Sequence, residues 1–222
     1  MKKILLSLAF VLVYFMPATA ADRAIGITLS AAQIDTDLTD DVDSNGSVDT
    51  TKSISNDVFY GSIFLEATKG PMTFGIDIIP MAAEFDTRST TQTSTKAKAD
   101  GAAPQVSGTN KATADVSKHV TLYLQPQFET PGGLTVFGTL GYVTADVEID
   151  YQSVSSINKI VNESLDGVKV GVGVKRDMGD RFMKFELAKI DYDDISLTTG
   201  NNTKVTADLD NTQLNLSIGK KF

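Results

Sequence analysis

Apolar and polar residues alternate along most of the chain after residue 20, which is the pattern of β-strands with one apolar face. Eight segments show it, and a helical period is nearly absent. The clearest segment sets four valines against lysines and glycines, from Val168 to Lys175. The apolar positions of the other seven run from Ile25 to Leu29, Gly61 to Ala67, Phe74 to Ile78, Val120 to Phe128, Leu134 to Tyr142, Met183 to Leu187 and Leu214 to Phe222.

The links between these segments alternate between short and long. Short links run from Ala67 to Pro71, from Glu129 to Gly133 and from Arg176 to Asp180, and the longest polar link is expected from about Arg88 to Asp115. Bacterial outer-membrane barrels have tight turns at the periplasmic end and long loops at the outer end. The sequence therefore predicts an all-β fold, an eight-stranded antiparallel up-and-down transmembrane β-barrel in the bacterial outer membrane.

The first 20 residues have the features of a cleaved signal peptide. Lys2 and Lys3 precede an apolar run from Ile4 to Phe15, and small residues follow from Ala18 to Ala20. The run is shorter than the roughly 20 residues that a spanning helix needs. We therefore expect residues 1–20 to be removed and residues 21–222 to form a single barrel domain.

Composition excludes several classes of function. The chain has no cysteine, so disulfides and thiolate metal sites are excluded. Its formal net charge of −8 argues against nucleic acid as a partner, because phosphate binding needs clustered basic residues. Tryptophan is also absent, so the aromatic girdles of a membrane barrel must come from other residues near strand ends: Phe59, Tyr60, Phe74, Phe128, Tyr142 and Phe182.

The polar positions of the predicted strands carry charges of both signs. On a lipid-facing surface each lysine would cost about 2 to 4 kcal/mol near the membrane centre, so these side chains are expected to face inward and pair. The expected lumen cluster is Glu66, Asp77, Lys169, Lys175, Lys184 and Glu186. The alternative is a soluble periplasmic or secreted lipocalin-like barrel, whose apolar positions face inward around an apolar ligand.

The end of the chain, LNLSIGKKF, resembles the last strand of bacterial outer-membrane barrels, in which apolar residues alternate up to a terminal aromatic residue. The matching residues are Leu214, Leu216, Ile218 and Phe222, with Lys220 as a departure. The segments LTVFGTLGYVTADVE and FMKFELAKIDYDD resemble strands of the OmpA transmembrane-domain and opacity-protein type. The resemblance implies assembly by the barrel-assembly machinery, contact with outer-membrane lipid and lipopolysaccharide, and loops exposed at the cell surface for a ligand that it does not identify.

One acidic stretch has part of a calcium-binding pattern. In DVDSNGSVD, Asp41, Asp43 and Asn45 occupy alternating positions before Gly46, and Asp49 follows. Lys52 stands where the pattern requires a bidentate glutamate. The stretch is therefore either a weak calcium site or, more simply, a solvated turn, and no other cofactor is expected.

Three functions remain open at this stage. The first is a non-enzymatic outer-membrane barrel with a structural, adhesive or surface-interaction role carried by its outer loops. The second is the soluble ligand-binding barrel, and the third is an outer-membrane enzyme that uses His119, the only histidine. A narrow pore is disfavoured because the expected charges would fill the lumen.

Overall fold

The computed structural model describes residues 22–41, 48, 50–80, 83–94, 106–152, 159–198 and 204–222. The signal peptide expected at residues 1–20 lies outside this part of the chain. All regular elements in it are strands: β1 (Asp22–Asp41), β2 (Thr50–Lys69), β3 (Met72–Ile78), β4 (Ala83–Ser94), β5 (Val106–Glu129), β6 (Leu134–Gln152), β7 (Lys159–Met178), β8 (Arg181–Tyr192), β9 (Ile195–Thr198) and β10 (Lys204–Lys221).

The ten strands occupy eight positions in the wall. β3 and β4 both pair with β5, and β8 and β9 both pair with β10, so each couple is one interrupted span. Pro80 lies in the first interruption, where a residue without a backbone N–H cannot continue the ladder. The second interruption is Asp193 and Asp194. All neighbours are antiparallel, and this arrangement confirms the predicted fold.

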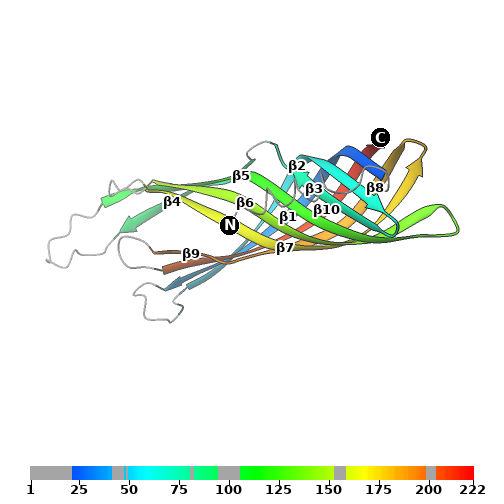
Figure 1. The fold of residues 1–222 in the computed structure, drawn as a ribbon. Coiled ribbons are helices and arrows are strands. Elements are labelled where there is room, and N and C mark those ends of the chain that lie inside the picture. The colour runs from blue at the N-terminus through cyan, green and yellow to red at the C-terminus, as the bar shows by residue number, and fades with distance from the viewer. Residues whose placement is uncertain are drawn as a thin grey trace.

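The wall closes where the first and last strands meet. β1 pairs with β10 over a ladder that runs from Ala24 opposite Lys221 to Asp41 opposite Lys204. Closure removes the free edges that a sheet would otherwise expose to lipid. In Figure 1 the tight turns and the C-terminus lie at one end, and the strands extend far toward the other.

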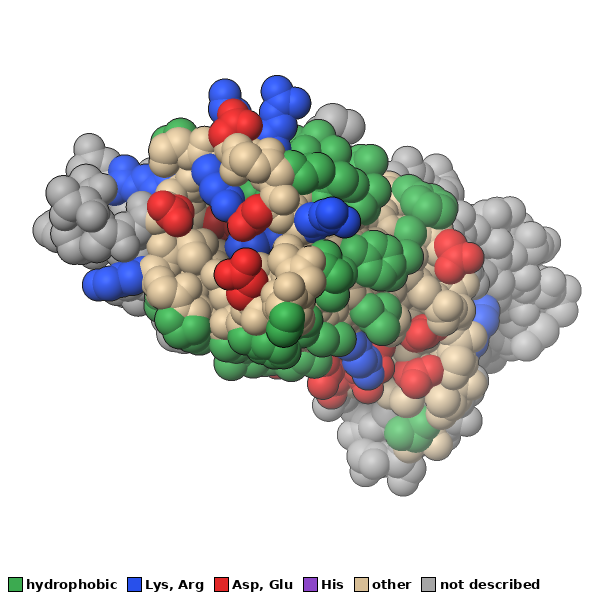
Figure 2. Space-filling model, turned by 90° about the vertical axis from the view of Figure 1, so that its right-hand side faces the viewer, with side chains coloured by type: hydrophobic (Ala, Val, Ile, Leu, Met, Phe, Trp, Pro, Cys, Tyr) green, Lys and Arg blue, Asp and Glu red, His purple; other side chains and the backbone are tan. Residues whose placement is uncertain are grey.

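The apolar positions of the strands face outward around the closed part of the wall. Leu29 is 64% exposed, Val172 is 58% exposed, and Leu187 is 52% exposed. A soluble barrel would bury these side chains, so the outward orientation is the reverse of the lipocalin-like alternative. Figure 2 looks onto the end with the tight turns and shows green hydrophobic side chains on the flank below the charged rim.

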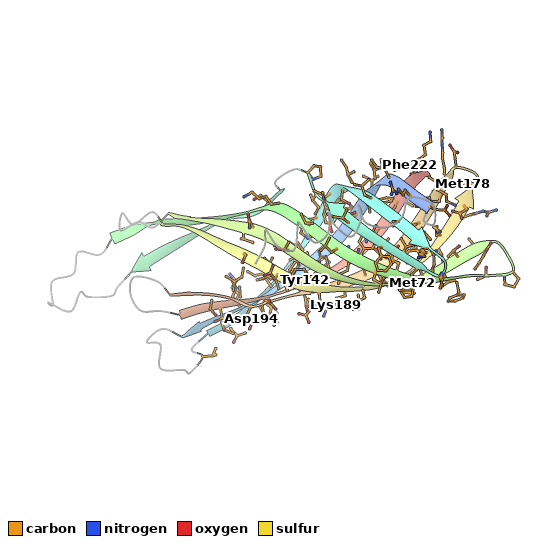
Figure 3. All side chains as sticks on the ribbon, in the orientation of Figure 1. Met72, Tyr142, Met178, Lys189, Asp194 and Phe222 are labelled. Carbon is orange, nitrogen blue, oxygen red and sulfur yellow. The ribbon has the colours of Figure 1, made fainter. Side chains whose placement is uncertain are left out.

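The outward apolar side chains form a band around the wall, which we call the apolar band. Charged residues mark both of its limits. On β8 the outward side chains between Arg181 and Lys189 are all apolar. Eight residues span roughly 26 Å along a strand, and a tilt of about 40° reduces this to roughly 20 Å across a membrane. Figure 3 shows the two sides of the band, with Met178 and Phe222 near the tight turns and Lys189 and Asp194 farther along the wall.

The expectation for the aromatic girdles was partly wrong. Phe59 is 83% exposed and Phe128 is 64% exposed, so both lie on the outer surface. Tyr60 instead donates a hydrogen bond to Gln213 in the interior, and Phe182 is buried at 2% exposure. Both of these residues occupy inward-facing positions of their strands, which the alternation of the sequence already indicated.

The strands continue well beyond the apolar band at the end opposite the tight turns. The long link expected from Arg88 to Asp115 was wrong, because β4 reaches Ser94 and β5 begins at Val106. Its threonines favour extended structure, and the strand ladder satisfies the backbone there. The first outer link is also shorter than expected, since β1 ends at Asp41 and β2 begins at Thr50.

Beyond the band the wall separates into two sheets. The outer half of β2 pairs only with β1, and β4 pairs only with β5. On the other side β9 pairs only with β10, and the outer half of β7 pairs only with β6. Figure 1 shows β4 to β7 leaving the barrel together, apart from β9 and the ends of β1, β2 and β10.

No helix in the described part of the chain is long and apolar enough to cross a membrane.

Candidate functional site

Four of the six charged residues expected in the lumen form two buried ion pairs. Lys184 contacts Glu66, and the Lys169 Nζ lies 2.9 Å from Glu186 Oε2. In both pairs the side chains are at most 12% exposed. A buried pair is stable only when further hydrogen bonds satisfy the remaining polar atoms. The structure provides such bonds on both carboxylates.

The carboxylates of these pairs accept hydrogen bonds from neutral side chains. The Tyr123 hydroxyl donates to Glu66 Oε1 at 2.7 Å, and the Asn215 amide donates to Glu186 Oε2 at 2.7 Å. Thr139 also donates to Glu186. These partners were not identified from the sequence. Their inward-facing strand positions were the available signal, but the choice of partner depends on strand register.

The remaining two charges, Asp77 and Lys175, are not members of the two pairs. Asp77 accepts a hydrogen bond from the Ser62 hydroxyl at 2.8 Å. Lys175 donates to Gln127 Oε1 at 3.2 Å and lies near the end with the tight turns. The structure therefore brings Glu66, Lys184, Lys169 and Glu186 into two pairs and leaves Asp77 and Lys175 with neutral partners.

Aromatic rings surround the Lys184 ammonium. Its Nζ lies 4.5 Å from the centroid of the Phe64 ring and between 5.7 and 5.9 Å from the rings of Tyr123, Phe137 and Phe182. Cation–π attraction is strongest where water is excluded. The rings need room, and inward-facing glycines on neighbouring strands provide it. A Cβ on Gly219 would lie 2.3 Å from Phe182 Cζ, and one on Gly26 would lie 2.3 Å from Phe64 Cζ.

The interior at this level is filled. The cavity beside Asp77, His119 and Lys169 has a volume of about 30 Å³, which is room for about two water molecules. Hydroxyl and amide side chains occupy the rest, as in the 2.8 Å bond between Thr28 and Ser217 and the 3.0 Å bond from Gln125 to Thr139. The described lumen therefore has no open path at this level.

His119 belongs to the same filled interior. Its Nε2 lies 3.2 Å from the Tyr192 hydroxyl, and the residue is 8% exposed. A register shift between Ser117 and Val120, with Lys118 at φ 52°, precedes it on β5. No carboxylate or serine hydroxyl is hydrogen-bonded to His119 in the described residues. The arrangement lacks the nucleophile and base pairing of a hydrolase.

In the part of the wall beyond the apolar band, farther from the tight turns, which we call the upper wall, strands β1, β6, β8 and β10 reverse their polarity. On β8 the outward series changes from apolar to charged, and the inward series changes from charged to apolar. The outward residues are Met183, Phe185, Leu187, Lys189 and Asp191, and the inward residues are Lys184, Glu186, Ala188, Ile190 and Tyr192. The sequence contains this reversal, but we predicted the strand only over its apolar positions from Met183 to Leu187, with a polar link after it.

The inward apolar residues of the upper wall pack into one cluster, which we call the outer core: Val143, Ala145, Val147, Leu165, Ile190 and Tyr192. Val143 is fully buried and Ile190 is 1% exposed. Ile195 and Leu209 pack against the cluster from β9 and β10. The cluster joins the two sheets as the core of a water-soluble sandwich would.

The outward surface of the upper wall is acidic. The Ser55 hydroxyl donates to Asp35 at 2.5 Å and, with the Gln33 amide, lowers the pKa of this carboxyl. Asp210 accepts a hydrogen bond from Lys189 at 2.9 Å and raises the pKa of that ammonium. Partial burial and neighbouring carboxylates, Asp194 first among them, raise the pKa of Asp208.

The calcium pattern lies mostly outside the described residues. Asp43, Asn45 and Asp49 are not described, and Asp41 is the last residue of β1. Among the described residues no group of three acidic or histidine side chains could hold a metal ion. Calcium binding by Asp41, Asp43, Asn45 and Asp49 therefore stays a prediction.

The residues of the expected assembly signal lie along the outer surface of β10. Leu214 and Leu216 are both 43% exposed, and Ile218 is 48% exposed. Phe222 follows the strand, is 73% exposed, and donates its backbone N–H to the Arg23 carbonyl at 2.9 Å. The four side chains share the lipid-facing surface, and recognition by an assembly machinery stays a prediction.

A family model described as "Outer membrane protein beta-barrel domain" matches residues 6–222. No curated protein sequence matches the chain.

Several solved barrels have a similar fold at low identity. The attachment invasion locus protein Ail of Yersinia pestis, in complex with the heparin analogue sucrose octasulfate, is 11% identical, with a TM-score of 0.45, over 92% of this chain and 100% of Ail. Neisserial surface protein A is 12% identical, with a TM-score of 0.43, over 90% and 99%. The outer membrane protease OmpT of Escherichia coli is 12% identical, with a TM-score of 0.48, over 92% and 98%.

Proposed function

The chain belongs to the family of outer membrane protein β-barrel domains. We propose that it is a cell-surface barrel with a filled lumen and a structural or adhesive role. The bacterial outer membrane is its location. The role is carried by the upper wall and by the links 42–49, 95–105, 153–158 and 199–203, which join its strands. The soluble lipocalin-like alternative is not favoured, since the apolar parity faces outward.

The polarity reversal along the strands is the observation that supports this proposal. It gives the upper wall a polar outer surface and a packed apolar interior, which suits water rather than lipid. Packing of Ile195 on β9 and Leu209 on β10 against the outer core, which includes residues of β6 and β7, ties the two sheets together. A wall built in this way can present its connecting links at a distance from the membrane.

We propose a role without catalysis. His119 contacts Tyr192 inside the barrel instead of a nucleophile, and the charged residues of the lumen are paired or hydrogen-bonded to neutral groups. A catalytic site needs a reacting group that a substrate can reach, and the interior at this level has room for only about two water molecules.

Two further partners follow from the location. Assembly would proceed through the barrel-assembly machinery, with Leu214, Leu216, Ile218 and Phe222 as the recognised surface of β10. Lipopolysaccharide would contact the wall at the upper limit of the apolar band, where Lys189 is half-exposed beside Asp210. No nucleic acid is expected, given the net charge of −8.

The test is adherence of a non-adherent bacterial host that expresses the full chain. We expect the host to gain attachment to epithelial cells or matrix-coated plates, and to lose it when short glycine and serine links replace residues 42–49, 95–105, 153–158 and 199–203. Val172→Leu, on the lipid-facing surface, is the matched control and should leave attachment unchanged.

The folded state of each variant is checked by its shifted gel mobility before and after heating. A barrel that folds, lies in the outer membrane, and gives the same attachment with all four links replaced would contradict an adhesive role. In that case a structural role of the wall would remain, to be measured as sensitivity of the deleted strain to detergent.

A further inference from the structure

We propose that the periplasmic mouth of the barrel contains a binding site for a small oxyanion, a carboxylate or a phosphate, with the ammonium of Lys175 as its main ligand. This site is separate from the surface role proposed above and does not depend on it. A cavity, a lysine without a counter-charge, and the distribution of charge at this end of the molecule support this site.

The cavity opens between the tight turns and has a volume of about 450 Å³. Small-molecule sites in proteins are of this size. We call it the periplasmic cup; Thr68, Gln127, Thr135, Lys175 and Phe182 line it. The lumen beyond it narrows to the cavity of about 30 Å³, so a ligand that enters from the periplasm stops at the cup.

Lys175 has no carboxylate partner in the described structure. Its Nζ donates to the neutral Gln127 at 3.2 Å and lies 5.7 Å from the centroid of the Phe182 ring. The carboxylates that act on it electrostatically are Asp177 and Glu66. Asp177 is 2.9 Å from the Lys221 Nζ, and Glu66 is paired with Lys184. Both are therefore already neutralised by other cations.

An ammonium that is partly removed from water without a counter-ion loses solvation that no partner replaces. An oxyanion in the cup would restore this interaction. Two neutral donors line the cup as well, the amide of Gln127 and the hydroxyl of Thr135. The Thr68 hydroxyl is hydrogen-bonded to Thr73 at 2.8 Å and is less free to contribute. A lysine with neighbouring neutral donors is a suitable set for a small oxyanion.

The charge around the cup favours an anion, although the chain as a whole is acidic. Lys220 lies 3.9 Å from Asp180, and Lys221 pairs with Asp177. After these pairs and the Glu66–Lys184 pair, the acidic side chains that remain in the lining of the cup are Asp22 and Glu129, and Arg23 and Lys175 balance them there. Lys69, Arg176 and Arg181, near the tight turns outside the lining, add positive charge at this end. Figure 2 shows blue and red side chains gathered at this end. An excess of positive charge around a recess attracts anions to it.

The experiment uses the purified full-length barrel in uncharged detergent micelles. Sodium acetate and sodium phosphate are titrated separately, against sodium chloride at the same ionic strength, and backbone amide shifts are followed by ¹⁵N NMR. We expect saturable shifts for Thr135, Lys175 and Asp177 with at least one of the two anions. Saturation by acetate would identify a carboxylate site, and saturation by phosphate would identify a phosphate site.

Three variants test the role of the lysine. Lys175→Gln should weaken binding at least tenfold, and Lys175→Arg should retain it because the charge remains. Lys189→Gln, at the opposite end of the barrel, is the matched control and should bind as the wild type does. Thr135→Val is a second variant, which should weaken binding severalfold even if Lys175→Gln does not fold.

Two results would overturn the proposal. One is equal binding by the wild type and a folded Lys175→Gln variant. If Lys175→Gln does not fold, equal binding by the wild type and the Thr135→Val variant overturns the proposal in the same way. The other is a wild-type response that stays linear with both anions and equals the response to sodium chloride.

Discussion

Lys184 on β8 and Glu66 on β2 form an ion pair inside the barrel, although 118 positions separate them in the chain. The pair crosses the lumen and connects strands that are not neighbours in the wall. Removing the cation alone would leave a buried carboxylate without a counter-charge. We expect Lys184→Ala to lower the free energy of unfolding by about 3 to 5 kcal/mol, measured by urea titration of the barrel in detergent.

The double variant Glu66→Gln, Lys184→Met separates the charge from the packing. Because it removes both charges and retains similar volumes, we expect it to recover most of the lost free energy. Equal losses in the single and double variants would mean that packing of the Lys184 chain among the rings, and not its charge, stabilises this layer.

Gly219 and the Phe182 ring provide the second prediction. A Cβ at position 219 would lie 2.3 Å from Phe182 Cζ, and the ring is 2% exposed, so it has little room to move. Overpacking of this kind costs about 1 to 3 kcal/mol. Gly219→Ala should therefore reduce the heat resistance of the folded band on gels. Gly61→Ala is the matched control, since the nearest atom to its Cβ would be 3.7 Å away.

The eight spans and the orientation of their side chains could be predicted because alternation is a local property of the sequence. Glu66, Lys169, Lys184 and Glu186 could be expected inside for the same reason, since a charge facing lipid is costly. Their pairing could not be predicted, because it depends on the register across the barrel.

The upper wall was misjudged for a different reason. Its strands reverse polarity: on β8 the outward residue Leu187 is apolar, and the next outward residue, Lys189, is charged. When only the apolar positions are followed, the strand ends at this point and its polar outward residues resemble a loop.

The limit of the membrane can be located with an arginine scan along β6. Leu140 is 55% exposed in the apolar band, and Thr144 lies on the same side of the strand beyond it. We expect Leu140→Arg to cost about 2 to 4 kcal/mol of folding free energy in lipid bilayers and Thr144→Arg to cost less than about 1 kcal/mol. Equal costs at both positions would place Thr144 within the hydrocarbon region and contradict an upper wall in water.

Asp208 provides a prediction about pH. Partial burial and its neighbours Asp194, Asp210 and Asp191 raise its pKa above the ordinary value of 3.8. The folded barrel therefore binds this proton more tightly than the unfolded chain does. The resulting stabilisation is full below the unfolded pKa and is lost as the pH rises through the folded pKa. We expect Asp208→Asn to be more stable than the wild type at pH 7 and equally stable near pH 3, with a difference that salt reduces.

The filled lumen predicts that the protein does not conduct ions. Two layers close it in succession, the ion pairs around Lys184 and Glu186 and the outer core around Ile190, and the cavity between Asp77 and His119 has a volume of only about 30 Å³. A hydrated ion would have to displace charges that are already paired, at a cost of several kcal/mol. Planar bilayers with the purified barrel should therefore show no discrete conductance steps at 100 mV. The double variant Lys169→Ala, Glu186→Ala removes one pair together with its volume and is expected to open small steps. Steps of the same size in the wild type and in this variant would show that ions cross the wild-type lumen.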